Sequence, residues 1–375
     1  MEKNHSEKEK MLRDLFRESE TNPLALELGN IFASKKNGIL DMETMLQLQS
    51  EAESIIGDGY FTLIDRDDAN AFAMEKDGIP IIALHAGAVK KILCTANILM
   101  LSDSFLPEVG DMTSCYSNIP SDIKTLETNY KDNSVLSMTV SKDPYRENIG
   151  YMIACLAIHF IVYHEVGHHA KGHVKRMKEK YNLFYSETPY THISNEYLEE
   201  RKRMELEADM YAADMLIEKI DSLMECWGKY REMDVTYSEI FQLIVLALVI
   251  VKENLPTEVW RVEDIEKGYY LPNIIRISII ILIIASEPRI KKAMYPDIVE
   301  LFTDDEEYKA EFENTYGIMV FDDNFQLTQK AYETFFSLMI AGAEQSYADI
   351  FVGNHLNTTF LSDIKAMNWF LYQYK

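Results

Sequence analysis

The spacing of hydrophobic and polar residues divides the chain into long helical stretches and one short region of strands. Apolar side chains recur every three or four positions, as in helices with one buried face, over 2–28, with a break near Pro23, and over 42–56, 87–100 and 195–220. Between 60 and 85 the pattern changes to short apolar runs bounded by turn-forming residues. The pattern predicts an α+β fold that is mainly α, with a small sheet.

The predicted sheet is built from three runs of residues: 60–64, 69–75 and 79–85. A Lys-Asp-Gly turn at 76–78 joins the last two runs, as in a small antiparallel sheet. Pro80 has no amide proton to donate to a neighbouring strand, which predicts an edge position or a bulge there. An open edge over 79–84 would accept an extended peptide as an additional strand.

A longer helix is predicted to begin at Asp143 and Pro144, because aspartate favours the position before a helix and proline favours its first position. The helical pattern continues past His173 and is separated from the next helix by a charged stretch and Pro189. Apolar runs occur at 149–163, 241–251 and 277–285. Each is shorter than the about 18 residues of a membrane span, so we expect buried helices and no membrane association.

The second half of this long helix carries a His-Glu-x-x-His motif. His164 and His168 are four residues apart and share one helix face, where two imidazoles can reach a single zinc ion. Glu165 is turned by about 100° from His164, so its carboxylate would lie beside the ion rather than on it. A carboxylate there can take the proton of an attacking water. The motif predicts zinc-dependent hydrolysis.

The helix at 195–220 supplies the predicted third ligand. Acids and small residues recur there on one face: Glu205, Ala208, Asp209 and Ala212. Glu205 is the expected ligand, and Asp209, one turn later, is expected to hydrogen-bond a ligand imidazole and fix its orientation. Glu207 is turned about 200° from Glu205 and is expected to point elsewhere. Three protein ligands leave one position open for water.

Composition limits the classes of partner. The 375 residues contain 37 Lys plus Arg and 61 Asp plus Glu, a net charge of −24 that opposes binding to nucleic acid or anionic lipid. The overall charge favours neutral or basic partners. The four cysteines form no C-x-x-C pair, and the first twenty residues lack the apolar core of a signal peptide. We therefore expect a cytoplasmic protein without a disulfide framework; its oligomeric state is not indicated.

These motifs resemble the gluzincin metallopeptidases, most closely the M48-like branch with its HExxH and ExxAD motifs. The sequence NAFA at 70–73, the following turn and strand, and Gly87 are similar to that family's approach to an active-site edge strand. His173, five residues after His168, matches a frequent position in the family, although it lies off the ligand face and is expected to be structural. The chain also resembles the cytosolic, soluble Lit-like phage-exclusion peptidases, which share the HExxH motif, and these short motifs do not separate the two families.

A later segment, 270–276, resembles the family's HPxxxxR motif. Arg276 matches the arginine, the proline falls one place later, and Tyr270 stands where the family has an oxyanion-stabilising histidine. A phenol can also donate a hydrogen bond to an oxyanion. The resemblance therefore implies that Tyr270, the neighbouring Tyr269 or Arg276 stabilises negative charge in the transition state.

The resemblance implies a zincin-like catalytic domain with a small edge sheet and a surrounding helical bundle. We expect a helical segment at 1–59, the metallopeptidase domain at 60–286 and a helical region of unknown role at 287–375. The implied activity is a Zn²⁺-dependent endopeptidase acting on protein or peptide substrates, with Glu165 as general base.

A non-catalytic function is the alternative. The chain could be a sensor or scaffold protein that uses zinc for stability and binds a partner through its acidic surface and C-terminal region. The presence of Glu165 argues against this, because a structural zinc site needs no base and usually has four protein ligands.

Overall fold

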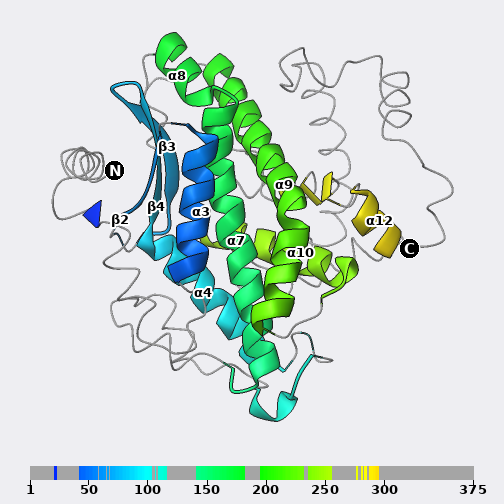
Figure 1. The fold of residues 1–375 in the computed structure, drawn as a ribbon. Coiled ribbons are helices and arrows are strands. Elements are labelled where there is room, and N and C mark those ends of the chain that lie inside the picture. The colour runs from blue at the N-terminus through cyan, green and yellow to red at the C-terminus, as the bar shows by residue number, and fades with distance from the viewer. Residues whose placement is uncertain are drawn as a thin grey trace. The chain divides into compact units, whose positions relative to one another are not determined.

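The computed structural model (Figure 1) describes the following residues: 21–22, 42–57, 59–64, 66, 68–103, 106, 109–115, 141–181, 195–231, 235–255, 276–277, 280–281, 283–284 and 287–294. Most of the predicted helix at 2–28, Tyr269, Tyr270 and most of the predicted C-terminal region lie outside the described residues.

The chain forms two compact units. One comprises Met1–Pro189 with Ile250–Pro256, and the other comprises Tyr190–Val249 with Thr257–Lys375. Within both, the described residues are mainly helical, and the strands form a small sheet in the first unit. The predicted α+β, mainly α fold class is confirmed. The domain boundaries expected from the sequence stay a prediction.

The sheet has the strand order β1-β2-β4-β3. The three longer strands are β2 (Tyr60–Ile64), β3 (Ala71–Lys76) and β4 (Ile79–His85), as the sequence predicted; β1 (Thr21–Asn22) pairs antiparallel with β2, within a stretch predicted to be helical. Asp77 and Gly78 form the β3–β4 turn with φ of 54° and 81°, a combination that Asp-Gly favours. β2 runs parallel to β4, so the sheet is mixed rather than purely antiparallel.

The prediction that 79–84 forms an open edge is wrong. β4 lies inside the sheet, paired with β2 on one side and β3 on the other. Pro80 is tolerated because the β2 ladder begins one residue later, at Ile81, and residues 81–85 are buried on both faces. Among the described residues, β3 pairs only with β4 and is therefore the edge strand on that side.

Helix α7 (Pro144–Ala170) is the core of the first unit. Asp143 accepts a hydrogen bond from the amide of Arg146 at 2.8 Å, which confirms the predicted start. Every residue from 149 to 163 is buried, and α7 contacts β3, β4 and the helices α3 (Met42–Ile55) and α4 (Ala86–Leu101). These contacts fix the rotation of α7 about its axis, and with it the direction of the His-Glu-x-x-His side chains.

By length and composition alone, α7 would also qualify as a membrane-spanning helix, although the apolar run at 149–163 is shorter than a span. Its most apolar stretch is wholly buried inside the protein, and core helices of soluble proteins pass the same test. One such helix is weak support for a membrane location.

The long helix ends earlier than the sequence predicted. Instead of continuing past His173, it stops at Ala170, and Gly172 adopts a left-handed φ of 71° with its amide bonded to the carbonyl of His169 at 3.0 Å. A second helix, α8 (His173–Tyr181), begins at the next residue. The glycine therefore redirects the chain immediately after the motif.

The second unit is built around α9 (Asn195–Arg231), which extends eleven residues beyond its predicted end at Ile220. Near the end of α9, Asp221 accepts a hydrogen bond from Tyr237 at 2.8 Å and pairs with Arg289 of α12 (Pro288–Met294) at 2.5 Å. These contacts anchor the first turn after Ile220, and Trp227, which is buried, anchors the turns that follow.

Helix α10 (Tyr237–Asn254) follows α9 and contains the apolar run at 241–251. Thr236 and Glu239 bond to each other's amides at its start, which forms a capping box. In the run at 277–285, the described residues Ile277, Ile280, Ile281 and Ile284 are buried and Ile283 is partly buried. Burial of this run therefore agrees with the prediction for four of its five described residues.

Candidate metal centre

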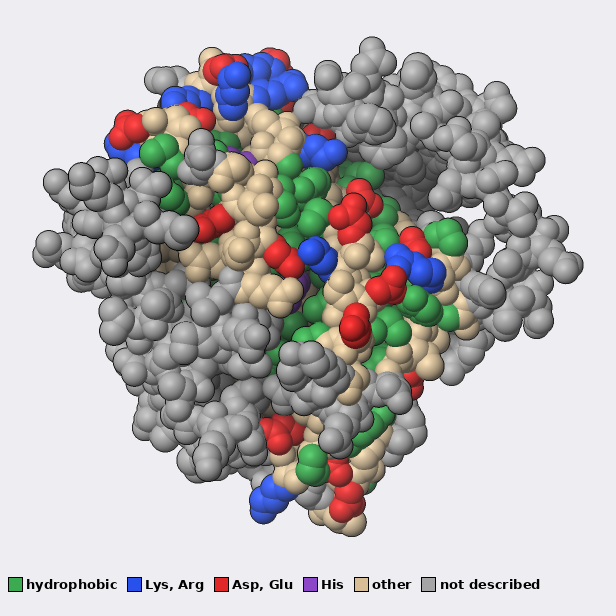
Figure 2. Space-filling view, in the orientation of Figure 1, with side chains coloured by type: hydrophobic (Ala, Val, Ile, Leu, Met, Phe, Trp, Pro, Cys, Tyr) green, Lys and Arg blue, Asp and Glu red, His purple; other side chains and the backbone are tan. Residues whose placement is uncertain are grey.

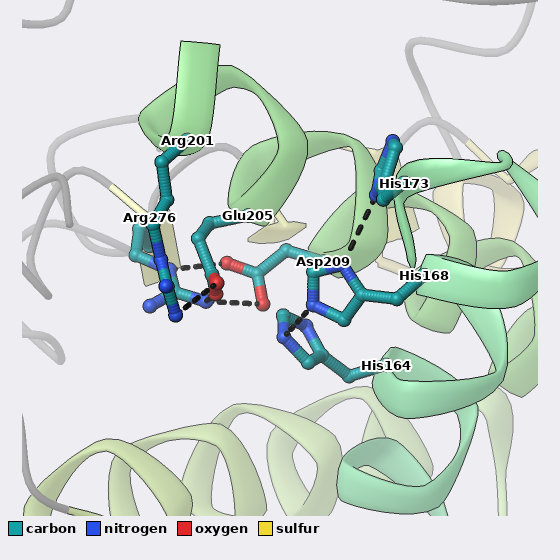
Figure 3. Close-up of polar contacts among 7 residues, drawn as sticks. All are labelled: His164, His168, His173, Arg201, Glu205, Asp209 and Arg276. Atoms are coloured by element: carbon teal, nitrogen blue, oxygen red, sulfur yellow. Dashed lines mark hydrogen bonds and ion pairs between the residues drawn. The ribbon is translucent and has the colours of Figure 1, made fainter. Parts of the chain in front are cut away.

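His164 and His168 face each other on adjacent turns of α7. Their Nε2 atoms are 3.1 Å apart, and their rings are nearly perpendicular (Figure 3). Two zinc–nitrogen bonds of about 2.0–2.1 Å at a tetrahedral angle would separate the nitrogens by about 3.3 Å. A hydrogen bond between the rings also fits this distance when one ring nitrogen carries a proton. The two Nε2 atoms therefore lie close enough together for one ion to contact both, and the ligand role predicted from the sequence stays a prediction.

His173 contacts the far side of the His168 ring. The two Nδ1 atoms are 3.0 Å apart, and both side chains are buried (Figure 3). If Nδ1 of His168 donates this hydrogen bond, its Nε2 is left as a lone-pair donor for a metal. The sequence assigned His173 a structural role because a continuous helix would turn it away. Because the helix ends before His173, the Gly172 turn can bring the His173 ring against His168.

Glu165 and His169 lie on other faces of α7. Glu165 is 6 % exposed, so its carboxylate belongs to the interior rather than to a solvated face. Nε2 of His169 donates to the carbonyl of Ile81 on β4 at 3.1 Å, which joins α7 to the sheet. Burial lowers the pKa of His169, and this hydrogen bond partly opposes the shift. His169 therefore supports the framework of the site.

Glu205 is held between two arginines. One carboxylate oxygen lies 3.7 Å from Arg201, one turn earlier on α9, and the other lies 3.5 Å from Arg276 (Figure 3). All three side chains are at most 4 % exposed. Glu207 pairs with Arg203 at 3.7 Å, in agreement with its predicted different direction. The spacing of Arg201 and Glu205 is a local signal that could have identified this arginine.

Arg276 forms its shortest bonds with Asp209. Its Nε and one terminal nitrogen donate to the two carboxylate oxygens at 2.5 and 3.0 Å. This two-pronged geometry is the strongest form of arginine–carboxylate pair. The sequence placed Arg276 near the reacting carbonyl and Asp209 beside a ligand imidazole; both roles stay predictions.

Three side chains form a group that could hold a metal ion. His164, His168 and Glu205 each offer one ligand atom, and these atoms all lie within 4.8 Å of one another. Two imidazole nitrogens and one carboxylate oxygen are the donors of many catalytic metal sites. These are the three ligands expected from the sequence. Tyr270 lies outside the described residues, so its predicted role is untested.

Comparisons with known proteins agree with a peptidase. Residues 110–256 match the family model described as Peptidase U49, a stretch that includes α7, α8, α9 and α10 but less than half of the chain. No curated protein and no solved structure matches the sequence. The match supports a hydrolase that cleaves protein or peptide substrates.

Proposed function

We propose that the chain is a zinc-dependent endopeptidase of the gluzincin type. The observation that carries this proposal is the grouping of His164, His168 and Glu205, with their ligand atoms within 4.8 Å. A base, Glu165, follows the first of these residues directly. The match to a peptidase family over the same part of the chain supports the same activity.

The donor atoms fit zinc. The Nε2 separation of 3.1 Å is close to the about 3.3 Å of a tetrahedral site, and the contact with His173 fits the tautomer of His168 that carries its proton on Nδ1 and binds metal through Nε2. Zinc held there would supply a Lewis acid for the scissile carbonyl and make a water more acidic. Three protein ligands are typical of a catalytic site rather than of a structural one.

Glu165 is the proposed general base. Its carboxylate would take a proton from the attacking water and later deliver it to the nitrogen of the departing amine. Because Glu165 is 6 % exposed, few bulk water molecules compete for this proton. Tyr270 or the neighbouring Tyr269 remains the predicted donor to the negative charge that develops on the carbonyl oxygen.

Arg276 is better suited to position Glu205 and Asp209 than to contact substrate. It is 3 % exposed and donates to both carboxylates. A buried carboxylate held in this way keeps a fixed orientation, as a metal ligand requires.

The substrate is proposed to lie along β3 rather than along 79–84. β3 pairs on one side only among the described residues, contacts α7 and follows directly on the NAFA segment. An extended peptide can add to such an edge through main-chain hydrogen bonds, which accept many sequences.

We also propose that the protein acts in the cytoplasm, as expected from the sequence.

The test is replacement of Glu165 by glutamine. Glu165→Gln keeps the size of the side chain but removes the base, so cleavage should fall about 10²- to 10⁴-fold while zinc content is retained. Glu147→Gln, about five turns earlier on the same helix, is the matched control and should cleave at the wild-type rate. The measurement is N-terminal profiling of lysate proteins incubated with each form. Zinc in the wild type without any cleavage would instead favour the scaffold function.

A further inference from the structure

A cluster of cations lies directly beyond the candidate metal centre, on α8. This nine-residue helix buries His173, Val174 and Met177. Its exposed face carries Lys175, Arg176, Lys178 and Lys180, with Glu179 as the one acid. Figure 2 shows these Lys and Arg side chains gathered over α8 at the top of the view. The local charge of +3 contrasts with the net charge of −24 of the whole chain.

Helix stability explains only part of this cluster. The helix dipole favours cations in the last turn, where Lys178 and Lys180 lie. Lys175 and Arg176 lie in the first turn, where the dipole disfavours positive charge and where no acid is present. The ion pair of Lys175 with Glu179, one turn later at 3.8 Å between exposed side chains, offsets only part of this cost. A remaining cost of this kind is expected where a charge serves binding rather than folding.

The start of α8 is joined to the candidate centre. His173, its first residue, contacts His168 at 3.0 Å. At a rise of about 1.5 Å per residue, the cations from Lys175 to Lys180 lie about 3 to 10 Å farther along the helix axis. The cluster therefore lies on a helix whose first residue contacts a proposed metal ligand.

The same helix is joined to the edge strand. Nζ of Lys178 donates to Glu75 of β3 at 2.8 Å. This hydrogen bond raises the pKa of Lys178, and the lysine neutralises the one acidic side chain of β3. Beyond that pair, α8 carries three further exposed cations, Lys175, Arg176 and Lys180, against one acid, Glu179, which lies 3.8 Å from Lys175.

We propose that the cationic face of α8 selects peptide substrates with acidic side chains close to the scissile bond. The inference rests on the proposed peptidase function and on binding of the substrate along β3. A strand advances by about 3.3 Å per residue, so the about 8 Å between Lys175 and Lys180 along the α8 axis equals about two to three residues of an extended peptide. Because these cations lie on one helix, we expect the affected positions on one side of the bond.

The acidic character of the whole chain does not oppose this preference. At physiological ionic strength, charges farther apart than about 8 Å are largely screened. The four cations of α8 outnumber the three acids that act on Lys178 (Glu75, Asp77 and Glu179), so the local field is positive, whereas the net charge governs approach from a distance.

The test is cleavage of a peptide library, made by digesting a proteome with a lysine-specific protease, by the zinc-loaded protein. Sequenced cleavage sites should show Asp or Glu enriched about two- to five-fold at one or more of three positions on one side of the bond, and the enrichment should decrease in 0.5 M salt. Cleavage without enrichment on either side would overturn the inference and leave the peptidase function standing.

Two charge reversals locate the effect. Lys175→Glu and Lys142→Glu each change the net charge from −24 to −26, but Lys142 is an exposed residue just before the opposite end of α7. Lys175→Glu should abolish the acidic enrichment, and Lys142→Glu should retain it. Loss of the enrichment in both variants would assign it to net charge and contradict a role for α8.

Failure of the peptidase function can be distinguished from failure of this inference. If the protein cleaves no peptide, the proposed function fails, and fluorescence polarisation of labelled Glu-rich and Gln-rich peptides becomes the test of α8. Tighter binding of the Glu-rich peptide that is lost in Lys175→Glu would support recognition of acidic peptides. Equal binding of the two peptides would overturn it.

Discussion

The histidines of α7 and the acidic residues of α9 are held by different physical means. His164 and His168 project from a helix whose direction is set by apolar packing, and their described polar contacts join imidazole rings. Glu205 and Asp209 are instead fixed by ion pairs with Arg201 and Arg276, all almost fully buried. Loss of a partner should therefore have different consequences in the two regions.

The kind of contact in each region determines which property a substitution lowers first. A buried carboxylate that loses its arginine keeps its charge in a poorly solvated place, which is costly. An imidazole that loses a neutral neighbour loses mainly its orientation and the preferred tautomer. Substitutions near α9 should thus affect folding first, and those near α7 should affect metal affinity first.

The largest effect is expected for Arg276→Ala. It leaves Asp209 and Glu205 without their shared cation, and should lower the free energy of unfolding by about 3–5 kcal/mol. Arg289→Ala is the control, because its side chain is 35 % exposed and its partner Asp221 is 57 % exposed, and it should cost about 1 kcal/mol or less. Urea unfolding followed by circular dichroism measures both. Equal costs would remove the distinction between buried and exposed pairs.

His173→Leu should weaken metal binding about 10- to 100-fold, since it removes the group that orients His168. His173→Asn is the matched variant, because its amide oxygen can accept the same hydrogen bond, and it should recover much of the affinity. Competition with a chromogenic zinc chelator gives the affinities. The same loss in both variants would mean that His173 only fills space.

Gly172→Ala should lower the free energy of unfolding by about 1 kcal/mol. The left-handed φ of 71° disfavours a β-carbon, although an added methyl would meet no atom within 4 Å. Zinc affinity measured in the same preparation should fall as well, because this turn brings His173 to His168. A variant as stable as the wild type would show that residue 172 does not need glycine for this left-handed backbone conformation.

The smallest effect concerns His85, which is buried and 3.0 Å from Asp68. Burial lowers the pKa of His85 below its usual 6.5, opposed in part by Asp68. The unfolded chain then binds a proton more readily, so stability should fall as pH decreases from about 6.5 toward the lowered pKa. Urea midpoints between pH 7.5 and 5.5 should show this slope in the wild type and a shallower one in His85→Gln.

The α7 half of the site was predictable because its signal is local. Two histidines four residues apart share a helix face whatever the rest of the fold, and Asp143 with Pro144 marks the start of that helix. The face of Glu205 and Asp209 was predictable for the same reason. Strands 60–64 and 79–85 were recognisable from their composition.

The remaining features depend on contacts between distant residues or on a missed signal. Arg276 pairs with Asp209 across 67 positions, which no helical spacing indicates. The interior place of β4 follows from its pairing with β2, although its continuous apolar run is typical of a strand buried on both faces. Gly172, which follows two histidines in the last turn of α7, is a recognised helix stop that the apolar pattern obscured.

The most direct test of the central claim is the zinc content of purified protein after reconstitution and dialysis, measured by mass spectrometry. We predict one zinc per chain in the wild type and in Glu207→Gln, a buried glutamate two positions from Glu205 that pairs with Arg203. Glu205→Gln should lose most of the zinc, as should His168→Ala. Wild-type protein without zinc, or a full zinc content in Glu205→Gln, would contradict the proposed metal centre.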